Sequence, residues 1–325
     1  MLKASLRAVF IAALLAGCAL FEGQPSDGLD PQLAPMPQRV AGIAGVATGT
    51  VLGLWCTQSA SASVTPAAIN RDNSVTWLGH SGFVIRMGGQ VVMVDPVLNE
   101  AFHTRFIIGR RIAGPPDISG LDRLDAILIS HGDNDHLDRP TLSALAARFP
   151  QARLILPKGA RLTTPVRGFD SIRHVDAWET LRLGGLEITP TPAVHHGRRI
   201  NPVPRRAPAF GFVLSDEQRR MFHSGDTGYG PVFREIAARF GHFDMAMVPI
   251  GAYQPEAFLS DVHATPEQAV QMALDLGARR AVPHHFGTFA LTPDDPALSL
   301  ARFRAAAGDR LETVALPIGG TTCID

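Results

Sequence analysis

Cysteine is scarce in this 325-residue chain, which has only three: Cys18, Cys56 and Cys323. No two of them form a Cys-x-x-Cys pair, so the sequence offers no thiolate zinc site of the common kind. Any metal ion must therefore be held by histidine and carboxylate side chains. Net charge is absent too, because 30 Lys and Arg residues balance 30 Asp and Glu residues. Without a basic excess, the composition gives no support to nucleic-acid binding.

Two apolar runs near the amino terminus bear on where the chain acts. Residues 1–18 combine Lys3 and Arg7 with a short apolar stretch and the ending Leu-Ala-Gly-Cys at Cys18, which is typical of a signal peptide. That ending resembles a bacterial lipobox. It implies a lipid anchor on Cys18 and a place in the cell envelope, at the membrane surface and facing the periplasm. A plain signal peptide and an uncleaved anchor are the alternatives.

Residues 19–70 are rich in Pro, Gly, Ser and Gln and are interpreted as a linker. The second apolar run, 41–55, has three alternative interpretations. It is a signal peptide if translation starts at Met36, and otherwise a membrane-associated helix or a flexible spacer. Hydrophobic residues make up 46% of the chain, enough for one large α/β domain, which we expect over 71–325. If Cys18 carries lipid, Cys56 and Cys323 remain as a pair that could form a disulfide in an oxidising compartment.

Polar side chains gather at 130–138, a stretch that reads Ser-His-Gly-Asp-Asn-Asp-His-Leu-Asp. An apolar run at 125–129 leads into it, so a buried strand delivers these groups to its carboxyl end, where α/β folds commonly place their sites. Imidazoles and carboxylates this close need positive charge among them, which one or two divalent metal ions supply. A solvated Asp-rich turn is the structural alternative.

The same pattern recurs along the chain. Apolar strands are expected at 75–78, 83–87, 91–94, 153–157, 181–183, 186–188, 210–214, 220–222, 245–249, 280–283 and 312–316, with helices at 142–149, 231–240, 265–276 and 298–307. A histidine or aspartate stands at or just beyond the end of five strands: Asp95, His131, His195, Asp226 and His285. Ligands from separate strand ends can converge on one polar centre.

The stretch 130–138 resembles the H-x-H-x-D-H signature of the metallo-β-lactamase superfamily. Within it, the chain is similar to the branch that contains N-acylphosphatidylethanolamine-hydrolysing phospholipase D and its bacterial relatives. Segments 77–81, 95–99, 225–229, 249–253, 263–267 and 285–289 also fit that branch, and the resemblance covers about residues 74–318. It implies an α/β fold, the four-layer αββα sandwich, in which two β-sheets face each other with helices outside.

The resemblance also implies metal ligands, carried over by position. One ion would take His131, Asp133 and His195, the other would take Asp135, His136 and His285, and Asp226 would bridge the two. His263 matches a family active-site histidine that binds no metal. His196 and His284 would then lie behind the ligands or at the surface.

One ligand departs from the family pattern, because Asp133 stands where the family has a histidine. A carboxylate oxygen is a harder ligand than an imidazole nitrogen and favours manganese or iron. Zinc remains the expected metal, since imidazoles still supply four of the seven ligands.

Two such ions would share one water molecule and lower its pKa from about 15.7 toward about 7, so that a metal-bound hydroxide attacks the substrate. Asp135 and His263 are the expected catalytic residues, and His263 would orient an oxyanion or protonate the leaving group. We expect a phosphodiesterase of the phospholipase D type, acting on a phospholipid or another small ester at a membrane. The alternatives are a lactone, amide or β-lactam hydrolase and a non-enzymatic envelope lipoprotein with a structural metal centre.

Overall fold

The computed structural model describes residues 66–103, 108–160, 167–199 and 205–324. The predicted signal peptide, the apolar run 41–55 and Cys56 lie outside these ranges, so the predictions made for them, including the disulfide to Cys323, stay predictions. Within the described ranges, no helix combines the length and the apolarity needed to cross a bilayer. The short helix α3 (Pro66–Ile69) comes first, and the buried side chain of Ile69 already belongs to the core.

The first β-sheet joins both ends of the described domain. In spatial order it contains β16 (Thr321–Cys323), β1 (Ser74–Gly79), β2 (Gly82–Met87), β3 (Gln90–Val94), β6 (Ala126–Leu128), β7 (Arg153–Pro157) and β8 (Ser171–Val175). Strands β16 to β3 pair antiparallel, whereas β3, β6, β7 and β8 pair parallel. Strands β2 and β3, both predicted, form a hairpin, in which Gly88 and Gly89 take the positive φ values of 59° and 71° that a tight two-residue turn requires.

The second β-sheet mirrors this arrangement. In spatial order it contains β15 (Glu312–Thr313), β14 (Ala278–His284), β13 (Phe243–Pro249), β12 (Arg220–His223), β11 (Arg205–Ser215), β10 (Leu186–Arg199) and β9 (Leu181–Leu183). Strands β12 to β15 pair parallel, and β9 to β12 pair antiparallel. A separate two-stranded ribbon is formed by β4 (Ala101–His103) and β5 (Ile108–Arg110).

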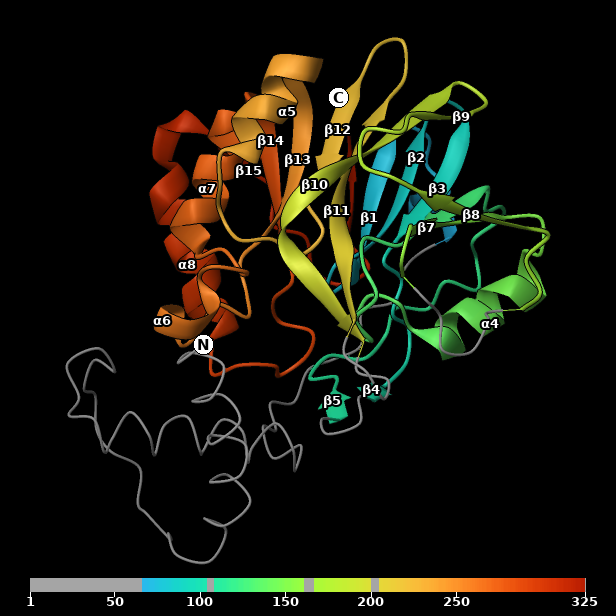
Figure 1. Cartoon of the computed structure of the whole chain (residues 1–325), viewed down its shortest axis with the longest axis horizontal. Helices are drawn as coiled ribbons and strands as arrows, with labels where there is room; N and C mark the ends of the chain where they lie inside the picture. Colours follow the sequence, from blue (N-terminus) through green and yellow to red (C-terminus); the bar gives the residue numbers. More distant parts are fainter. Residues whose placement is uncertain (1–65, 104–107, 161–166, 200–204, 325) are drawn as a thin grey trace, which may run out of the picture. The chain divides into compact units, whose positions relative to one another are not determined.

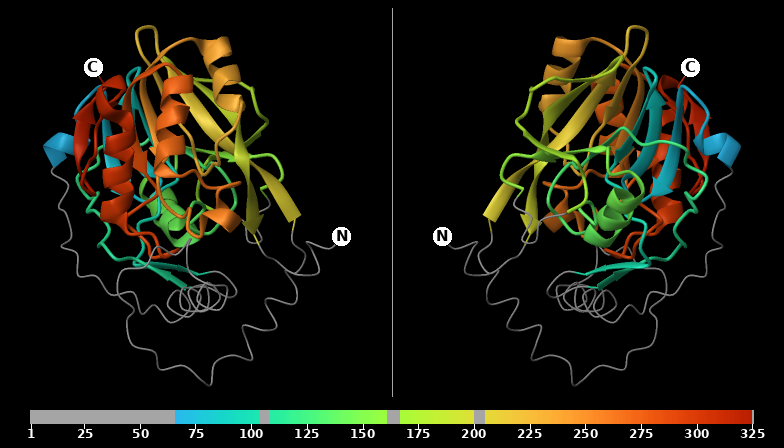
Figure 2. Two further views of the ribbon diagram at one scale, coloured as in Figure 1. Left: turned by 90° about the vertical axis from the view of Figure 1, so that its left-hand side faces the viewer. Right: turned by 90° about the vertical axis from the view of Figure 1, so that its right-hand side faces the viewer.

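The sheets are stacked between helices in four layers (Figure 1). Helices α5 (Val232–Phe240), α7 (Pro266–Asp275) and α8 (Pro296–Ala307) cover the second sheet, and α4 (Arg139–Arg148) covers the first. Figure 2 shows these two covered faces from opposite sides. The short elements α6 (Glu256–Leu259) and η1 (Gly308–Arg310) complete the chain. The αββα sandwich predicted from the resemblance is confirmed.

Strand periodicity explains the layers, because alternate side chains of the inner strands enter different cores. On β2, Phe83, Ile85 and Met87 enter the core between the sheets, whereas Val84 enters the core beneath α4. On β13, Met245 and Met247 face the same inter-sheet core, and neighbouring residues pack against the helices. Both faces of these strands are buried, which explains why the sequence shows continuous apolar runs there.

Most predicted elements are present, and their ends differ in places. Helix α7 begins as predicted, with Thr265 as N-cap in a capping box with Gln268, and Gly277 follows it at a φ of 64°. Helix α4 begins at Arg139, three residues before the predicted start, because Asp138 caps it and accepts a hydrogen bond from the Thr141 amide. The exposed edge strand β8, the end strand β16 and the ribbon β4–β5 were not predicted.

Candidate metal centre

Loops at the carboxyl ends of parallel strands carry most of the predicted ligands. Asp95 directly follows β3, His131 lies shortly after β6, Asp226 shortly after β12, and His285 directly follows β14. Parallel strands end at the same edge of a sheet, so both sheets present these groups at one edge of the sandwich. The prediction that strand-end residues converge is confirmed for these four positions by the distances given below.

His195 reaches the same centre in another way, which corrects the sequence interpretation. It lies inside the 14-residue strand β10 and not beyond a strand end. The pairing of β10 with β11 shifts register between Pro192 and His196. Such an irregularity re-aims side chains, and it turns a mid-strand histidine toward the centre.

The first predicted ligand group is assembled in the structure. Donor atoms of His131, His195 and Asp226 all lie within 4.8 Å of one another. The carboxylate of Asp133 lies 3.6 Å from His131 Nε2 and 3.8 Å from His195 Nε2. Asp133 is therefore close enough to both histidines to complete this group, and its role as a ligand stays a prediction.

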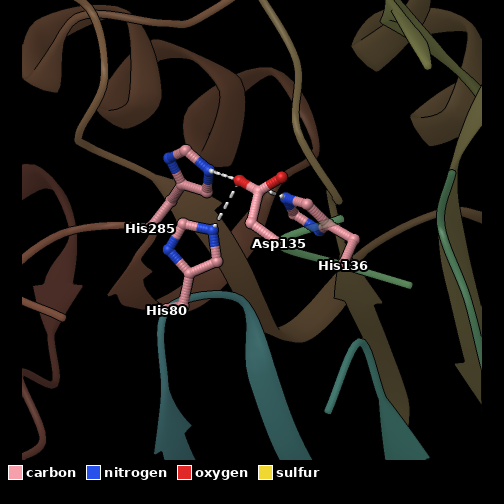
Figure 3. A group of neighbouring side chains, drawn as sticks. All are labelled: His80, Asp135, His136 and His285. Carbon is pink, nitrogen blue, oxygen red and sulfur yellow. Dashed lines mark hydrogen bonds and ion pairs between the residues drawn. The ribbon is translucent and has the colours of Figure 1, made fainter. Parts of the chain in front are cut away.

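The second predicted group is assembled beside it (Figure 3). Asp135 Oδ2 lies 3.7 Å from His136 Nε2 and 4.0 Å from His285 Nε2. Asp226 Oδ2 lies 3.2 Å from His136 Nε2 and 3.0 Å from His285 Nε2. Asp226 thus contacts both groups, which is the position that a bridging ligand needs.

Several buried polar atoms in this region make no well-formed hydrogen bond to the described residues, although two of them lie close to the Asp226 carboxylate. They are Nε2 of His131, His136, His195 and His285, Oδ1 of Asp226, and Nδ1 of His263 and His285. Buried polar atoms are nearly always paired, so this concentration needs an explanation. Two ligands about 2.1 Å from one tetrahedral ion lie about 3.4 Å apart, and the nitrogen–oxygen distances here span 3.0–4.0 Å. The donor set fits metal ions.

Charge within the cluster supports the same conclusion. Burial would raise the pKa of the Asp226 carboxyl, but the facing His136 and His285 hold it well below its usual range. Burial would likewise lower the pKa of His136, but Asp226, Asp135 and Asp95 hold it well above the usual value. The carboxylates therefore favour a positive charge among them, which the protonated His136 supplies in the absence of a metal ion. A bound cation would take over this role, and His136 would release its proton.

Asp95 orients histidines of both ligand groups. Its buried carboxylate accepts hydrogen bonds from His136 Nδ1 at 2.8 Å and from Ser130 Oγ at 2.5 Å. Ser130 Oγ in turn accepts one from His131 Nδ1 at 2.8 Å. His195 Nδ1 similarly donates to the Val262 carbonyl at 3.0 Å. These contacts occupy Nδ1 and direct Nε2 of each ring into the cluster.

His80 joins the second group, although its sequence position predicts no ligand or catalytic role for it. Its Nε2 donates a hydrogen bond to Asp135 Oδ2 at 3.0 Å (Figure 3). It lies in the β1–β2 turn at a φ of 53°, where its amide donates to Thr288 Oγ1 at 2.6 Å and its carbonyl accepts from the His285 amide at 2.9 Å. His80 therefore positions Asp135 through its ring and His285 through its backbone.

We expect the His80→Phe variant to bind its second metal ion about 10- to 100-fold more weakly, because Asp135 loses the donor that orients it. His80→Gln, which keeps an N–H donor, should lose less. Chelator competition measures the affinity, with His242→Phe at an exposed position as the matched control. Equal affinities for the His80→Phe protein and the control would contradict this role.

Two further histidines lie behind the ligands. His284 is buried, and its ring contacts Ser81 Oγ at 3.2 Å and Ser224 Oγ at 3.0 Å, so of the two predicted placements the structure selects the one behind the ligands. Its neighbour His223 donates to the Ser81 carbonyl at 3.0 Å, and the two rings stack with centroids 4.9 Å apart. The side chain of His196 lies outside the described part of the structure.

His263 lies at the rim of the cluster. Its Nδ1 is 3.9 Å from Asp226 Oδ2, and its ring packs edge-on to His195 and nearly parallel to His285. Burial lowers the pKa of His263 to about 3. The structure thus places the predicted catalytic histidine next to both ligand groups, and its role stays a prediction.

The backbone beside His285 leaves no room for a larger residue at Gly251. A Cβ atom there would lie 2.0 Å from the His285 carbonyl oxygen, far inside van der Waals contact. This close approach follows the end of β13 and fixes the loop that carries His285. Glycine at 251 is therefore a structural requirement of the centre.

Comparisons with known proteins agree with this geometry. A sequence model of the beta-lactamase superfamily domain matches residues 90–286. An uncharacterised protein of Mycobacterium tuberculosis is 33% identical over 255 residues, which are 76% of this chain and 67% of that protein. N-acyl-phosphatidylethanolamine-hydrolyzing phospholipase D 1 of Caenorhabditis elegans is 30% identical over 226 residues, 66% of this chain. The match spans 64% of the nematode protein, less than two thirds of its length.

Solved structures show the same fold. A metallo hydrolase from Ignicoccus hospitalis superposes with a TM-score of 0.57 at 20% identity, over 77% of this chain and 97% of its own. CmlA, a diiron beta-hydroxylase from Streptomyces venezuelae, superposes with a TM-score of 0.55 at 19% identity, over 78% of this chain and 54% of its own. The family match, the shared sandwich and the assembled donor set agree, and the chain belongs to the beta-lactamase superfamily, among its metal-dependent hydrolases.

Proposed function

We propose that this protein is a phosphodiesterase with two divalent metal ions that cleaves a phospholipid-like substrate in the manner of a phospholipase D. The observation that carries the proposal is the position of Asp226, whose carboxylate contacts His136 and His285 of one group and clusters with His131 and His195 of the other. The nematode relative and a yeast relative, 29% identical over 261 residues, are both named as phospholipases D that hydrolyse N-acyl-phosphatidylethanolamine.

Two ions at this centre would supply Lewis-acid activation of water and neutralise negative charge on a phosphoryl group. His131, Asp133 and His195 would hold the first, Asp135, His136 and His285 the second, and Asp226 both. We propose zinc as the resident metal on the strength of the four imidazoles. Manganese and iron are the alternative metals, because Asp133 adds a hard oxygen donor. The structurally similar CmlA is described as a diiron protein.

The chain's own residues would orient and protect the reacting group. Asp95 and His80 fix the ligand rings and carboxylates, so the ions would be held at a set separation. His263 would orient the scissile group's oxygen as a neutral imidazole, since its ring lies at the rim of the cluster. A pKa of about 3 argues against the alternative role as proton donor to the leaving group. The predicted lipid anchor at Cys18 would bring this centre to a membrane surface in the cell envelope.

The test is direct hydrolysis by the full-length, metal-loaded protein. Vesicles of N-acylated and plain phosphatidylethanolamine are incubated with it, and phosphatidic acid is measured by mass spectrometry. We expect release that His136→Ala abolishes, with its fold checked by circular dichroism. Turnover of nitrocefin or an acyl lactone in place of the lipids would replace this proposal with a carbonyl hydrolase. If neither lipid, nitrocefin, the acyl lactone nor bis-p-nitrophenyl phosphate is cleaved, only a structural role for the metal centre remains.

A further inference from the structure

A cavity of about 380 Å³ lies beside the metal centre, and His285 belongs to both. Its walls come mainly from residues 285–296, the segment between β14 and α8, together with Ile112 and residues 251–252. Ligand sites commonly have volumes of about 300–1,000 Å³, so the volume of this cavity is at the low end of that range. It has room for one slim chemical group next to the ions.

The cavity is lined chiefly by apolar side chains. Ile112, Phe286, Phe289 and Leu291 are among them, and no Lys or Arg is among the described residues that line the cavity. A phosphate or carboxylate would find no cationic partner there apart from the ions themselves. An apolar group, by contrast, gains free energy from leaving water in proportion to its buried area.

The polar groups on the wall are already engaged within the protein. Asp294 accepts hydrogen bonds from the Tyr253 and Gln254 amides at 3.2 and 2.9 Å, and burial raises the pKa of its carboxyl. Asp295 accepts from the Ala297 amide at 2.8 Å as the N-cap of α8, and Ser299 pairs with the Tyr253 hydroxyl at 3.3 Å. These side chains hold the loop in shape and are not directed to recognise a polar ligand.

The wall is supported from behind. Phe102 on β4 packs edge-on against Phe289 with ring centroids 5.1 Å apart, and the Arg111 guanidinium lies 5.1 Å from the centre of the same ring. Arg111 also forms a β-bridge with Phe289. Phe102 thus supports Phe289, one of the residues that line the cavity. The cavity is therefore preformed.

We propose that this cavity binds one hydrocarbon chain of the substrate while the scissile group lies at the metal centre. The proposal rests on the proposed hydrolase function and specifies its substrate class: an amphiphile that carries an alkyl or acyl chain within reach of the cavity when its scissile bond lies at the ions. His285 links the two, because it lines the cavity while its fully buried ring faces Asp226 in the second ligand group, so a chain in the cavity would lie about one side chain away from the ions. The small volume of the cavity favours a single hydrocarbon chain over a bulky group, and its apolar lining without Lys or Arg disfavours a charged headgroup.

Chain length tests this proposal with the full-length, metal-loaded protein. The substrates are p-nitrophenyl alkyl phosphates with methyl, butyl and octyl groups. We expect kcat/KM to rise with length, by up to about fourfold per methylene that enters the cavity. Ala290→Trp, which fills the cavity, should bring the octyl-to-methyl ratio close to one, and Leu291→Asn should lower it. Leu298→Trp, on the exposed face of α8, is the matched control and should keep the wild-type ratio.

Binding of octylphosphonate and methylphosphonate, measured by calorimetry, separates the two proposals because it needs no turnover. If no phosphodiester is cleaved but octylphosphonate binds at least tenfold more tightly, and Ala290→Trp removes the difference, the phosphodiesterase is wrong and the cavity assignment stands. Equal affinities for the two phosphonates would overturn the cavity assignment whatever the protein hydrolyses. So would equal ratios in the Ala290→Trp, Leu291→Asn and Leu298→Trp proteins.

Discussion

Replacing Asp226 with alanine is expected to reduce hydrolysis at least about 1,000-fold and to lower the metal content from two ions per chain to one or none. Asp226 is buried and lies 3.2 Å from His136 Nε2 and 3.0 Å from His285 Nε2. Its removal would therefore take a ligand from both ions at once and leave these imidazoles without the carboxylate that faces them. Inductively coupled plasma mass spectrometry measures the metal, and hydrolysis of bis-p-nitrophenyl phosphate measures the rate.

The matched control is Asp309→Ala, which removes an exposed aspartate in η1. It should keep full metal content and full activity. Asp226→Asn keeps the shape of the side chain and, if alanine unfolds the protein, separates loss of charge from loss of structure. Two ions retained by a folded Asp226→Asn protein, with activity within tenfold of wild type, would refute the bridging role.

Placing a histidine at position 133 is expected to shift metal preference toward zinc. Asp133 Oδ2 lies 3.6 and 3.8 Å from the Nε2 atoms of His131 and His195, so Asp133→His would replace a hard oxygen donor by an imidazole in the first ligand group. It would also remove one of the three carboxylates that balance the cations. We expect the bound manganese-to-zinc ratio to fall about tenfold, on the order of 1.4 kcal/mol.

Metal competition measures this shift without reference to activity. Each protein is dialysed anaerobically against equal concentrations of zinc, manganese and ferrous ions, and the bound metals are then quantified. Asp309→His makes the same substitution at an exposed site and should leave the wild-type ratio unchanged. An unchanged ratio in Asp133→His would show that Asp133 is not a ligand that discriminates between metals.

Local sequence signals were reliable where one physical cause dominates. The apolar runs of β2, β3 and β13 are continuous because both faces of these strands are buried, so burial alone made them visible. The start of α7 was predicted at residue 265, and the capping contacts of Thr265 and Gln268 that begin it are made within four residues of chain. The donors at 131–136 were recognisable for the same reason, since they stand together in the sequence.

Other features escaped the sequence because their causes lie elsewhere in the chain. Strand β8 exposes most of its side chains at a sheet edge and lacks an apolar pattern, and β16 exists because it pairs with β1, about 245 residues away. His80 showed only as a histidine after a strand. Its role depends on Asp135 and His285, which folding brings to the same turn.

By itself, the sequence determined the kind of chemistry: with no paired thiolates available, its histidines and aspartates, set mostly at the ends of buried strands, required a cation. Tertiary structure alone decided which groups meet. The bulge in β10 turns His195 inward, Asp95 orients rings of both groups, and Asp226 lies between them. Ligand geometry is a property of distances across the sandwich, and those are fixed by the packing of two sheets rather than by neighbours along the chain.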